Sequence, residues 1–147
     1  MFTTEPDMAK PEQSAMVYLV DEDPSVRGAL GRLLRSAGLE TREFESGDDL
    51  LDAGIGSQQG CVVAALRMPG GAGIDLPRRL RELGCDIPVI LLSAEANANG
   101  RSAARSAGAF SFFRKPVDGE ALIDAVEWAL NVPGPRQGRV KITQKEI

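Results

Sequence analysis

Residues 16–24 read MVYLVDEDP, and this stretch decides the fold that we expect. Its first five residues form a continuous apolar run, which is typical of a strand buried on both faces. The acidic residues Asp21, Glu22 and Asp23 end that run. Asp23 is suited to cap the first free N–H groups of a helix, and Pro24 to occupy the first helical position, where its missing N–H costs nothing. The stretch therefore predicts a buried strand that leads through an acidic loop into a helix.

The same alternation of apolar strand and periodic helix recurs along the chain. Residues 26–37 carry the apolar face of the first helix, and Gly38 is a natural stop after it. Five strands alternating with five helices predict an α/β fold, a doubly wound parallel sheet covered by helices on both faces. The further strands are expected at 41–44, 61–65, 89–92 and 110–113, and the further helices near 46–51, 76–83, 96–107 and 118–130.

The composition is that of a globular domain. The chain has 147 residues, of which 43% are hydrophobic and 26% are charged. Its formal net charge of −4 argues against direct nucleic-acid binding, and the absence of histidine excludes imidazole catalysis and histidine metal ligands. No apolar run is long enough to span a membrane. Cys61 and Cys85 form neither a metal motif nor a disulfide framework, so we expect a cytoplasmic protein with Cys61 in the core.

The chain divides into three expected segments. Residues 1–14 are polar and lack periodicity, which indicates a flexible leader. The alternating strands and helices occupy 15–131, the expected folded domain. Residues 132–147 begin with a stretch rich in proline and glycine and finish in a basic stub, so we expect a linker and a C-terminal tail there.

Polar residues follow three of the expected strands at the point where each strand ends. Asp21 and Glu22 come after the first strand, Ser93 after the fourth and Lys115 after the fifth, whereas the third strand ends in Ala65. The carboxyl ends of parallel strands line the ligand site in sheets of this kind. We therefore expect two acids, a hydroxyl and an ammonium group to converge around Ala65.

Residues from about 16 to 130 resemble a response-regulator receiver domain, the phosphate-accepting module of two-component signalling. The resemblance is greatest to the receivers of nitrogen-fixation and LuxR-type regulators, and it implies a flavodoxin-like (βα)5 fold with strand order 2-1-3-4-5. A receiver is a signalling module and not an enzyme. The motifs that carry the resemblance are Val20-Asp21-Glu22-Asp23-Pro24, Leu66-Arg67-Met68-Pro69-Gly70 with Gly73, Leu92-Ser93-Ala94, Gly108-Ala109 and Lys115-Pro116.

The resemblance also implies a magnesium site. Asp21 and Glu22 match the acidic pair that holds Mg²⁺ in the family, and the backbone carbonyl of Arg67 matches a further ligand. Mg²⁺ is a hard cation that prefers carboxylate and water oxygens in octahedral geometry, so these residue types suit it.

The remaining matches concern the phosphoryl group and the switch that responds to it. Ser93 matches the hydroxyl that hydrogen-bonds the phosphoryl oxygen, and Lys115 matches the ammonium that neutralises its charge. Phe112 matches the aromatic residue that moves inward when that hydroxyl moves. Pro116 matches a proline that follows a cis peptide bond, which only proline makes cheap.

Ala65 departs from the family pattern at the most important position. The resemblance implies an aspartate there, which accepts the phosphoryl group and binds Mg²⁺, and a methyl group does neither. We therefore expect no phosphorylation at residue 65 and weak or absent Mg²⁺ binding, with Lys115 left between two acidic partners, Asp21 and Glu22. Either the alanine is native and the chain is a pseudo-receiver, or it replaces an aspartate in a variant of an ordinary receiver.

The resemblance further implies partners. A sensor histidine kinase or another signalling protein is expected to contact the domain, with no membrane contact. The face made by the helix near 96–107, the strand at 110–113 and the helix at 118–130 changes on activation in the family, and it is the expected surface for a homodimer.

Two other functions share parts of this pattern. A phosphatase of the haloacid-dehalogenase type would also use an Asp-x-Asp, here Asp21 and Asp23, with a strand-end hydroxyl, a lysine and Mg²⁺. However, Pro24 stands where that family has threonine, and no second acidic strand end follows Lys115. Alternatively, the chain is the receiver half of a DNA-binding regulator whose output domain begins in the basic stub, although no helix-turn-helix pattern is present.

Overall fold

The computed structural model describes residues 15–55, 60–67, 73–94 and 98–131. The expected leader at 1–14 and the expected linker and tail at 132–147 lie outside the described residues. The same is true of Met68, Pro69 and Gly70 in the loop motif and of the first two residues of the helix expected at 96–107.

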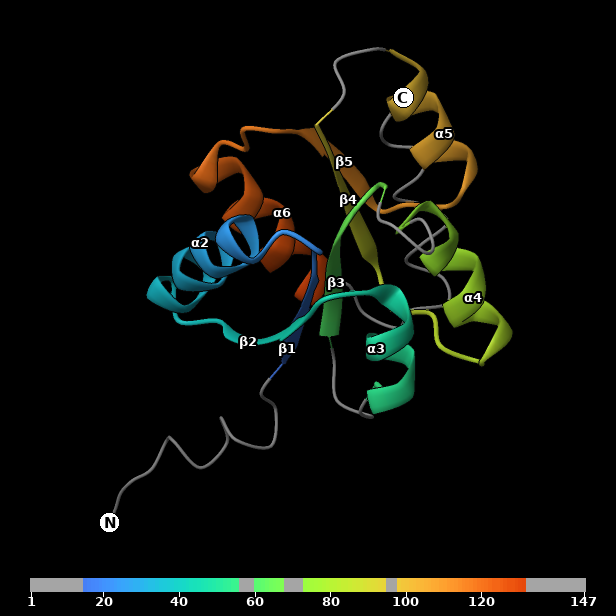
Figure 1. The fold of residues 1–147 in the computed structure, drawn as a ribbon, viewed down its shortest axis with the longest axis horizontal. Coiled ribbons are helices and arrows are strands. Elements are labelled where there is room, and N and C mark those ends of the chain that lie inside the picture. Colours follow the sequence, from blue (N-terminus) through green and yellow to red (C-terminus); the bar gives the residue numbers. More distant parts are fainter. Residues whose placement is uncertain (1–14, 56–59, 68–72, 95–97, 132–147) are drawn as a thin grey trace.

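Five parallel strands form a single sheet (Figure 1). Their order is β2-β1-β3-β4-β5, which confirms the doubly wound, flavodoxin-like fold. Because every pairing is parallel, the carboxyl ends of all five strands meet at one edge of the sheet. The strands are β1 (Met16–Val20), β2 (Glu40–Phe44), β3 (Gly60–Ala65), β4 (Val89–Ser93) and β5 (Ser111–Arg114).

One α-helix follows each strand, as the alternating pattern predicted. Within the described ranges, no helix combines the length and the apolar character needed to cross a membrane. A short 3-10 turn, η1 (Gly73–Asp75), precedes the third helix. The α-helices are α2 (Pro24–Ser36), α3 (Gly47–Ala53), α4 (Leu76–Glu82), α5 (Ala98–Ser106) and α6 (Gly119–Leu130).

Side-chain caps fix where three of these helices begin. The side chains of Asp23, Ser46 and Asp118 each accept a hydrogen bond from a backbone N–H in the first turn of α2, α3 and α6. Each cap satisfies a donor that has no partner inside the helix. Helix α2 stops before Gly38, whose φ of +85° is accessible to glycine at little cost.

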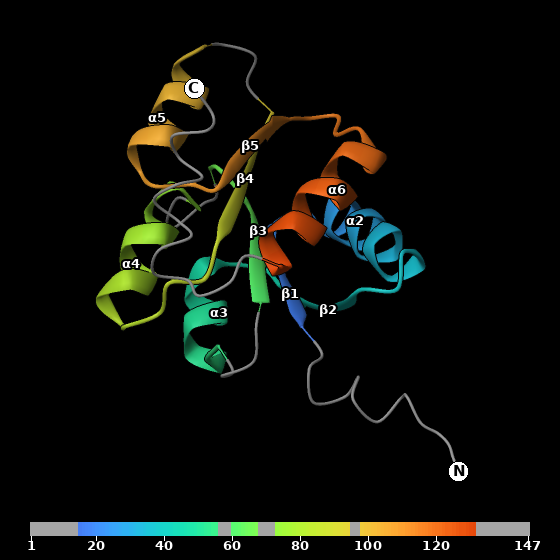
Figure 2. The same cartoon turned by 180° about the vertical axis from the view of Figure 1, so that it is seen from behind.

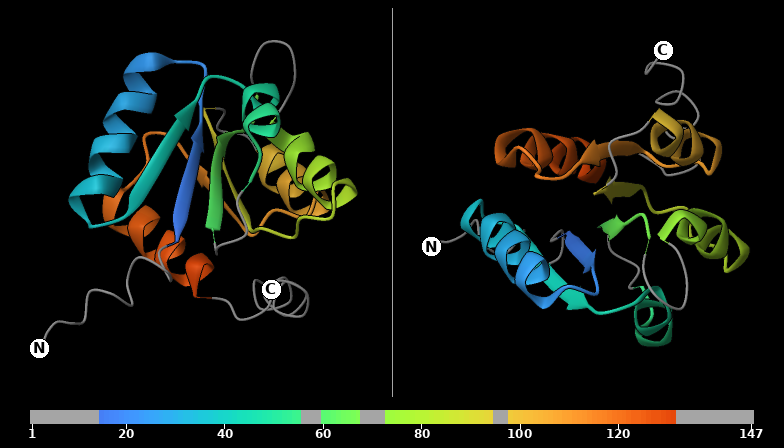
Figure 3. Two further views of the ribbon diagram at one scale, coloured as in Figure 1. Left: turned by 90° about the horizontal axis from the view of Figure 1, so that it is seen from below. Right: turned by 45° about the horizontal axis from the view of Figure 1, so that its top comes forward.

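The sheet lies between two layers of helices (Figures 2 and 3). On one face α2 and α6 pack against the strands, with Leu34 and Leu122 in the core. On the other face α3, α4 and α5 contribute Leu50, Leu80 and Ala104 to a second core. The central strands contribute residues to both cores, so both helix layers pack against the same strands.

The central strands are buried on both faces. In β1, Val17 and Leu19 belong to the core under α2 and α6, whereas Tyr18 and Val20 belong to the opposite core, as the alternation of side chains in a strand requires. All residues of β3 and β4 are buried. This burial explains why the sequences of β3 and β4 are continuously apolar. It also holds their carboxyl ends in fixed positions at the edge of the sheet.

Cys61 in β3 is a core residue, as expected. It is fully buried in the core under α2 and α6. Burial raises the pKa of its thiol to about 12, because the thiolate would lose its hydration. The thiol therefore stays protonated and unreactive in the folded domain near neutral pH.

Gly73 packs directly against the end of β3. A Cβ atom at this position would overlap the carbonyl oxygen of Ala65. The next residue, Ile74, donates its backbone N–H to the carbonyl of Leu66 at 3.3 Å. Only a residue without a side chain allows the returning chain to come this close, so Gly73 helps to hold the backbone at Ala65.

We expect Gly73→Ala to lower the free energy of unfolding by about 1–3 kcal/mol, because its methyl group must push η1 away from β3. Gly28→Ala in α2 is the control. Its new Cβ would meet only the Arg32 Nη1 atom, at 3.6 Å, and alanine favours a helix interior over glycine by about 0.5–1 kcal/mol. Urea unfolding measures both variants. Equal stability of the two would contradict the close packing at Gly73.

Candidate functional site

The carboxyl-terminal edge of the sheet gathers polar side chains from distant parts of the sequence. Asp21 follows β1, Ser93 ends β4 and Lys115 follows β5, while Ala65 ends β3, which lies between β1 and β4. Asp21 and Ser93 are the two buried polar residues of the described part of the chain, with 2% and 3% of their surface exposed. Buried polar groups are costly unless they are paired, so this edge needs internal partners.

Lys115 and Asp21 form an ion pair across this edge. The Lys115 Nζ atom donates a hydrogen bond to Asp21 Oδ2 at 3.0 Å. The Asp21 side chain is 3% exposed and that of Lys115 is 23% exposed. Water screens the pair only weakly, and the loss of either partner would leave the other poorly solvated. The fold thus joins two of the residues that the sequence singled out.

Three further contacts hold Asp21 in position. Its Oδ1 atom accepts a hydrogen bond from the backbone N–H of Asp23 at 3.0 Å. Its carbonyl oxygen accepts one from Arg27 Nη1 at 2.6 Å, and its own N–H donates to the carbonyl of Phe44 at 3.1 Å. Arg27 also lies 3.8 Å from the carboxylate of Glu43. Each oxygen of the Asp21 carboxylate therefore already has a donor.

The backbone of Lys115 is held just as firmly. Its N–H donates to the carbonyl of Ser93 at 2.8 Å, which continues the β4–β5 hydrogen bonding beyond the end of the strand. The peptide bond between Lys115 and Pro116 is cis. The hydrogen bond to Ser93 holds the Lys115 backbone beside the end of β4, and the side chain reaches Asp21 from there.

The other predicted site residues take different positions. Glu22 and Arg67 are exposed, and Ala65 is 5% exposed at the end of β3. Within the described residues Lys115 pairs with Asp21 and not with Glu22, so the expectation of two acidic partners was wrong. The physical reason is that the Asp21 side chain is buried at the strand end, whereas that of Glu22 is exposed to solvent.

Phe112 in β5 is half-buried and packs against the core under α3, α4 and α5. The guanidinium carbon of Arg101 lies 5.5 Å from the centre of its ring, a distance at which a cation is attracted to an aromatic face. A Cβ atom at Gly100 would come within 3.3 Å of the same ring. The ring is therefore closely covered by α5.

Sequence analysis missed Arg27 and Arg101. Arg27 binds a carbonyl oxygen at the end of β1, and Arg101 covers a ring on another element. Nothing in the local pattern marks either contact. The only signal was their place on helices that follow strands ending at this edge.

The described residues do not make up a set of ligands that fits a divalent cation. Within the described ranges, no three side chains of His, Cys, Asp or Glu lie close enough together to hold a metal ion. Mg²⁺ prefers near-octahedral oxygen coordination and gives up water reluctantly. Here the buried carboxylate of Asp21 faces an ammonium group, and Ala65 contributes no side-chain oxygen.

The fold and the strand-end residues agree with one family of proteins. The family model of the response regulator receiver domain matches residues 17–127. The chain therefore belongs to the response regulator receiver family, a family of two-component signalling modules that generally bind Mg²⁺ at the phosphorylation site. This membership favours a receiver over the phosphatase that the Asp-x-Asp also allowed.

Among curated relatives, the transcriptional regulatory protein TdiR of Thauera aromatica is 42% identical over 121 residues, which cover 82% of this chain and 53% of TdiR. The response regulator protein TodT of Pseudomonas putida is 34% identical over 134 residues, which cover 90% of this chain and 59% of TodT. The chain thus spans little more than half the length of these two relatives.

Solved structures show the same fold. The response regulator StyR superposes with a TM-score of 0.76 and 36% identity, covering 90% of this chain and 67% of the StyR chain. The FixJ-N structure superposes with a TM-score of 0.74 and 31% identity, covering 80% of this chain and 94% of that chain.

We expect Lys115→Met to lower the free energy of unfolding by about 1–3 kcal/mol, because the buried Asp21 carboxylate loses its charged donor. Arg78→Met is the matched control. It removes ion pairs with Glu82 and Asp75 in which every side chain is about half exposed or more, and such surface pairs contribute at most about 1 kcal/mol each. Urea unfolding at neutral pH compares the two. If Lys115→Met costs no more than Arg78→Met, the ion pair does not stabilise the edge.

Proposed function

We propose that this chain is a receiver module that signals through protein–protein contacts and does not accept a phosphoryl group at the end of β3. The observation that carries the proposal is the side chain at that place. Ala65 lies 5% exposed at the end of the central strand, between the strands that present Asp21 and Ser93. A methyl group has no lone pair with which to attack phosphorus, so the position cannot act as the nucleophile.

We propose that Ser93, Lys115 and Phe112 keep the positions expected from the resemblance, although no phosphoryl group is accepted beside them. Ser93 and Lys115 stand where a hydroxyl and an ammonium would contact a phosphoryl group, and Phe112 stands where the switch aromatic would move. In a receiver with aspartate at residue 65, the phosphoryl group would come from a sensor histidine kinase. Here we propose that such a kinase, or another signalling protein, acts by binding alone.

The surface for these contacts is the face made by α5, β5 and α6. Its two helices carry opposite charge. Helix α5 exposes Arg101 and Arg105 and has no acidic residue, whereas α6 exposes Glu120, Asp124 and Glu127 and has no basic residue. A surface with one basic and one acidic side is complementary to a second copy of itself turned by a two-fold axis.

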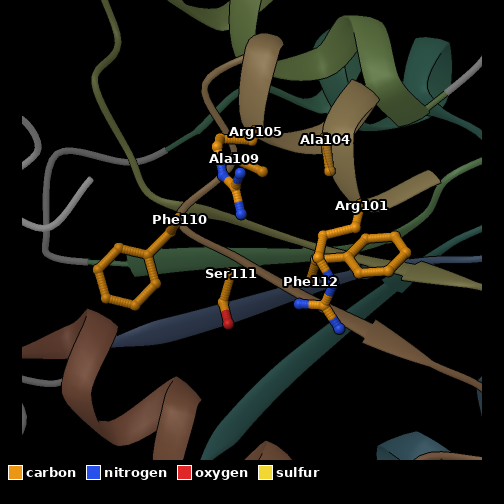
Figure 4. Close-up of a pocket in the computed structure, with 7 residues that line it drawn as sticks. All are labelled: Arg101, Ala104, Arg105, Ala109, Phe110, Ser111 and Phe112. Carbon is orange, nitrogen blue, oxygen red and sulfur yellow. The ribbon is translucent and has the colours of Figure 1, made fainter. Parts of the chain in front are cut away.

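A groove of about 220 Å³ opens on the basic side of this face (Figure 4). Its walls include Arg101, Arg105, Phe110, Ser111 and Phe112. Figure 4 shows the Arg101 side chain lying along the Phe112 ring. The groove is the size of one or two side chains, so an acidic side chain of α6 from a second copy would suit it in both charge and size.

The relatives suggest how such a module is used. TdiR is named a transcriptional regulatory protein and TodT a response regulator, and both are longer than this chain. We propose that the chain likewise controls an output domain of a transcription regulator. Its net charge of −4 favours a role in control over one in DNA contact.

We expect acetyl phosphate with Mg²⁺ to phosphorylate the Ala65→Asp variant and to leave the chain with Ala65, called here the starting chain, unphosphorylated. The reason is that only the variant has a carboxylate nucleophile at the end of β3. Intact-mass spectrometry reads the outcome. The double variant Ala65→Asp with Asp21→Asn is the control, and it should lose the modification if Asp21 supports metal binding. A stable phosphoryl adduct on the starting chain would contradict the proposal.

We expect the homodimer to weaken roughly thirtyfold in Arg105→Glu. The two-fold axis makes the variant lose two ion pairs of about 1 kcal/mol each, and about 2 kcal/mol changes the dissociation constant by about this factor. Adding Asp124→Arg should restore the dimer. Arg32→Glu carries the same charge change on α2, which is not part of the proposed face, and serves as the control. Analytical ultracentrifugation at low salt measures all of them. A monomer at every concentration, or equal dimers in all variants, would contradict the assigned surface.

A further inference from the structure

An apolar groove lies where the neighbouring helices α3 and α4 end (Figures 1 and 2). Its volume is about 310 Å³, and its aliphatic walls come from Leu51, Ile55, Leu80 and Leu83, with Cys85 beside them. Leu83 is 68% exposed, the most exposed large hydrophobic residue in the described part of the chain. A hollowed apolar surface with such a residue in its wall marks a place where another group binds.

We propose that this groove binds a later segment of the same chain, Arg139-Val140-Lys141-Ile142, with the side chains of Val140 and Ile142 inside it. The segment lies outside the described residues, and its sequence supplies the pattern that matches the groove. The inference goes beyond the proposed function and does not rest on it. The groove involves neither Ala65 nor the face of α5, β5 and α6.

The groove and the end of α6 lie at the same edge of the sheet. Each helix follows the carboxyl end of a parallel strand and returns along the sheet, so the helices end at its amino-terminal edge. The described chain stops at Asn131, directly after α6. Ile142 is eleven residues further on, and an extended segment of that length spans about 36–40 Å. Because a helix is about 10–12 Å across, this reach suffices to pass around the edge from one helix layer to the other.

The segment has one apolar side and one basic side when it is extended. Alternate side chains of an extended chain point in the same direction. Val140 and Ile142 therefore share one side, and Arg139 and Lys141 share the other. The groove has room for two aliphatic side chains, so the apolar side of the segment suits it in both size and polarity.

The helix that borders the groove carries the charge that the basic side requires. Asp49 and Asp52 of α3 are exposed, and Asp52 directly follows Leu51, which lines the groove. Helix α3 contains no basic residue. Acidic groups at the rim of an apolar groove attract a segment in which basic and apolar residues alternate, and they fix its direction and register.

Helix α4 adds little opposing charge at this place. Arg79 is neutralised by Asp48 of α3, whose Oδ1 atom lies 2.7 Å from Arg79 Nη2. Arg78 pairs with acidic residues on its own side of the helix. The guanidinium of Arg81 reaches Gly108, where a Cβ atom would lie 3.0 Å from its Nη1 atom, and Gly108 is not part of the groove.

Cys85 in the groove wall permits a direct test by disulfide formation with oxidised glutathione. The variant Ile142→Cys should form an intramolecular disulfide with Cys85, because docking holds the two thiols together. Thr143→Cys is the matched control, since its tether is equally long but its side chain points away from the groove. We expect the disulfide to form at least about tenfold faster in Ile142→Cys, the factor that corresponds to burying one aliphatic side chain. Cys61 does not compete, because it is fully buried.

Peptide mapping by mass spectrometry identifies the disulfide, and non-reducing electrophoresis separates monomers from linked dimers. Adding Leu83→Asp to Ile142→Cys should remove the rate advantage, because a carboxylate in the wall opposes apolar binding. Equal rates for Ile142→Cys and Thr143→Cys would overturn the proposal, since a free tether brings either cysteine to Cys85. Disulfide-linked dimers as the main product would also overturn it, because the occupant would then be a second copy.

A second measurement uses the starting chain and depends on the folding of no variant. Nuclear Overhauser effects are expected between the methyl groups of Ile142 and those of Leu83. Their absence at a concentration where the chain is monomeric would overturn the proposal. Neither measurement depends on the phosphorylation of Ala65→Asp, so the two proposals fail or stand separately.

Discussion

The ion pair between Lys115 and Asp21 is the interaction on which the carboxyl-terminal edge of the sheet depends. Its two side chains come from opposite ends of the domain, and they meet because β1, β3, β4 and β5 are parallel neighbours whose ends lie together. Asp21 is buried at the end of an apolar strand, a place that tolerates a carboxylate only with a charged partner. The parallel topology therefore brings the Lys115 ammonium next to the Asp21 carboxylate. The ion pair in turn compensates the buried charge of Asp21.

The rest of the domain supports this edge. The buried strands β3 and β4 hold Ala65 and Ser93 in fixed positions at this edge. Gly73 lets the backbone after β3 approach the end of that strand closely. Function then divides between two places. At the carboxyl-terminal edge, Lys115 and Asp21 pair with each other near the methyl group of Ala65. On the face of α5, β5 and α6, the two helices expose opposite charges to solvent. This arrangement agrees with the proposed role, in which the receiver binds a partner and does not accept a phosphoryl group at residue 65.

Much of this arrangement was predictable from sequence, because it depends on strong periodic signals. The apolar runs that end in Asp21, Ala65 and Ser93 identified buried parallel strands, and the parallel topology then required their ends to converge. The choice of partner was not predictable. Asp21 and Glu22 are adjacent and chemically alike, and only the alternation of side chains at the end of β1 decides which is buried and paired with Lys115. The contacts of Arg27 and Arg101 were missed because they join different elements through long side chains, which local periodicity does not report.

A crystal structure of the chain would test the central claim most directly, through the surroundings of the Asp21 carboxylate. The account predicts that the Lys115 Nζ atom lies within hydrogen-bonding distance of Asp21 Oδ2, at the 3.0 Å separation found here. A Lys115 side chain turned away from Asp21 into solvent would contradict it.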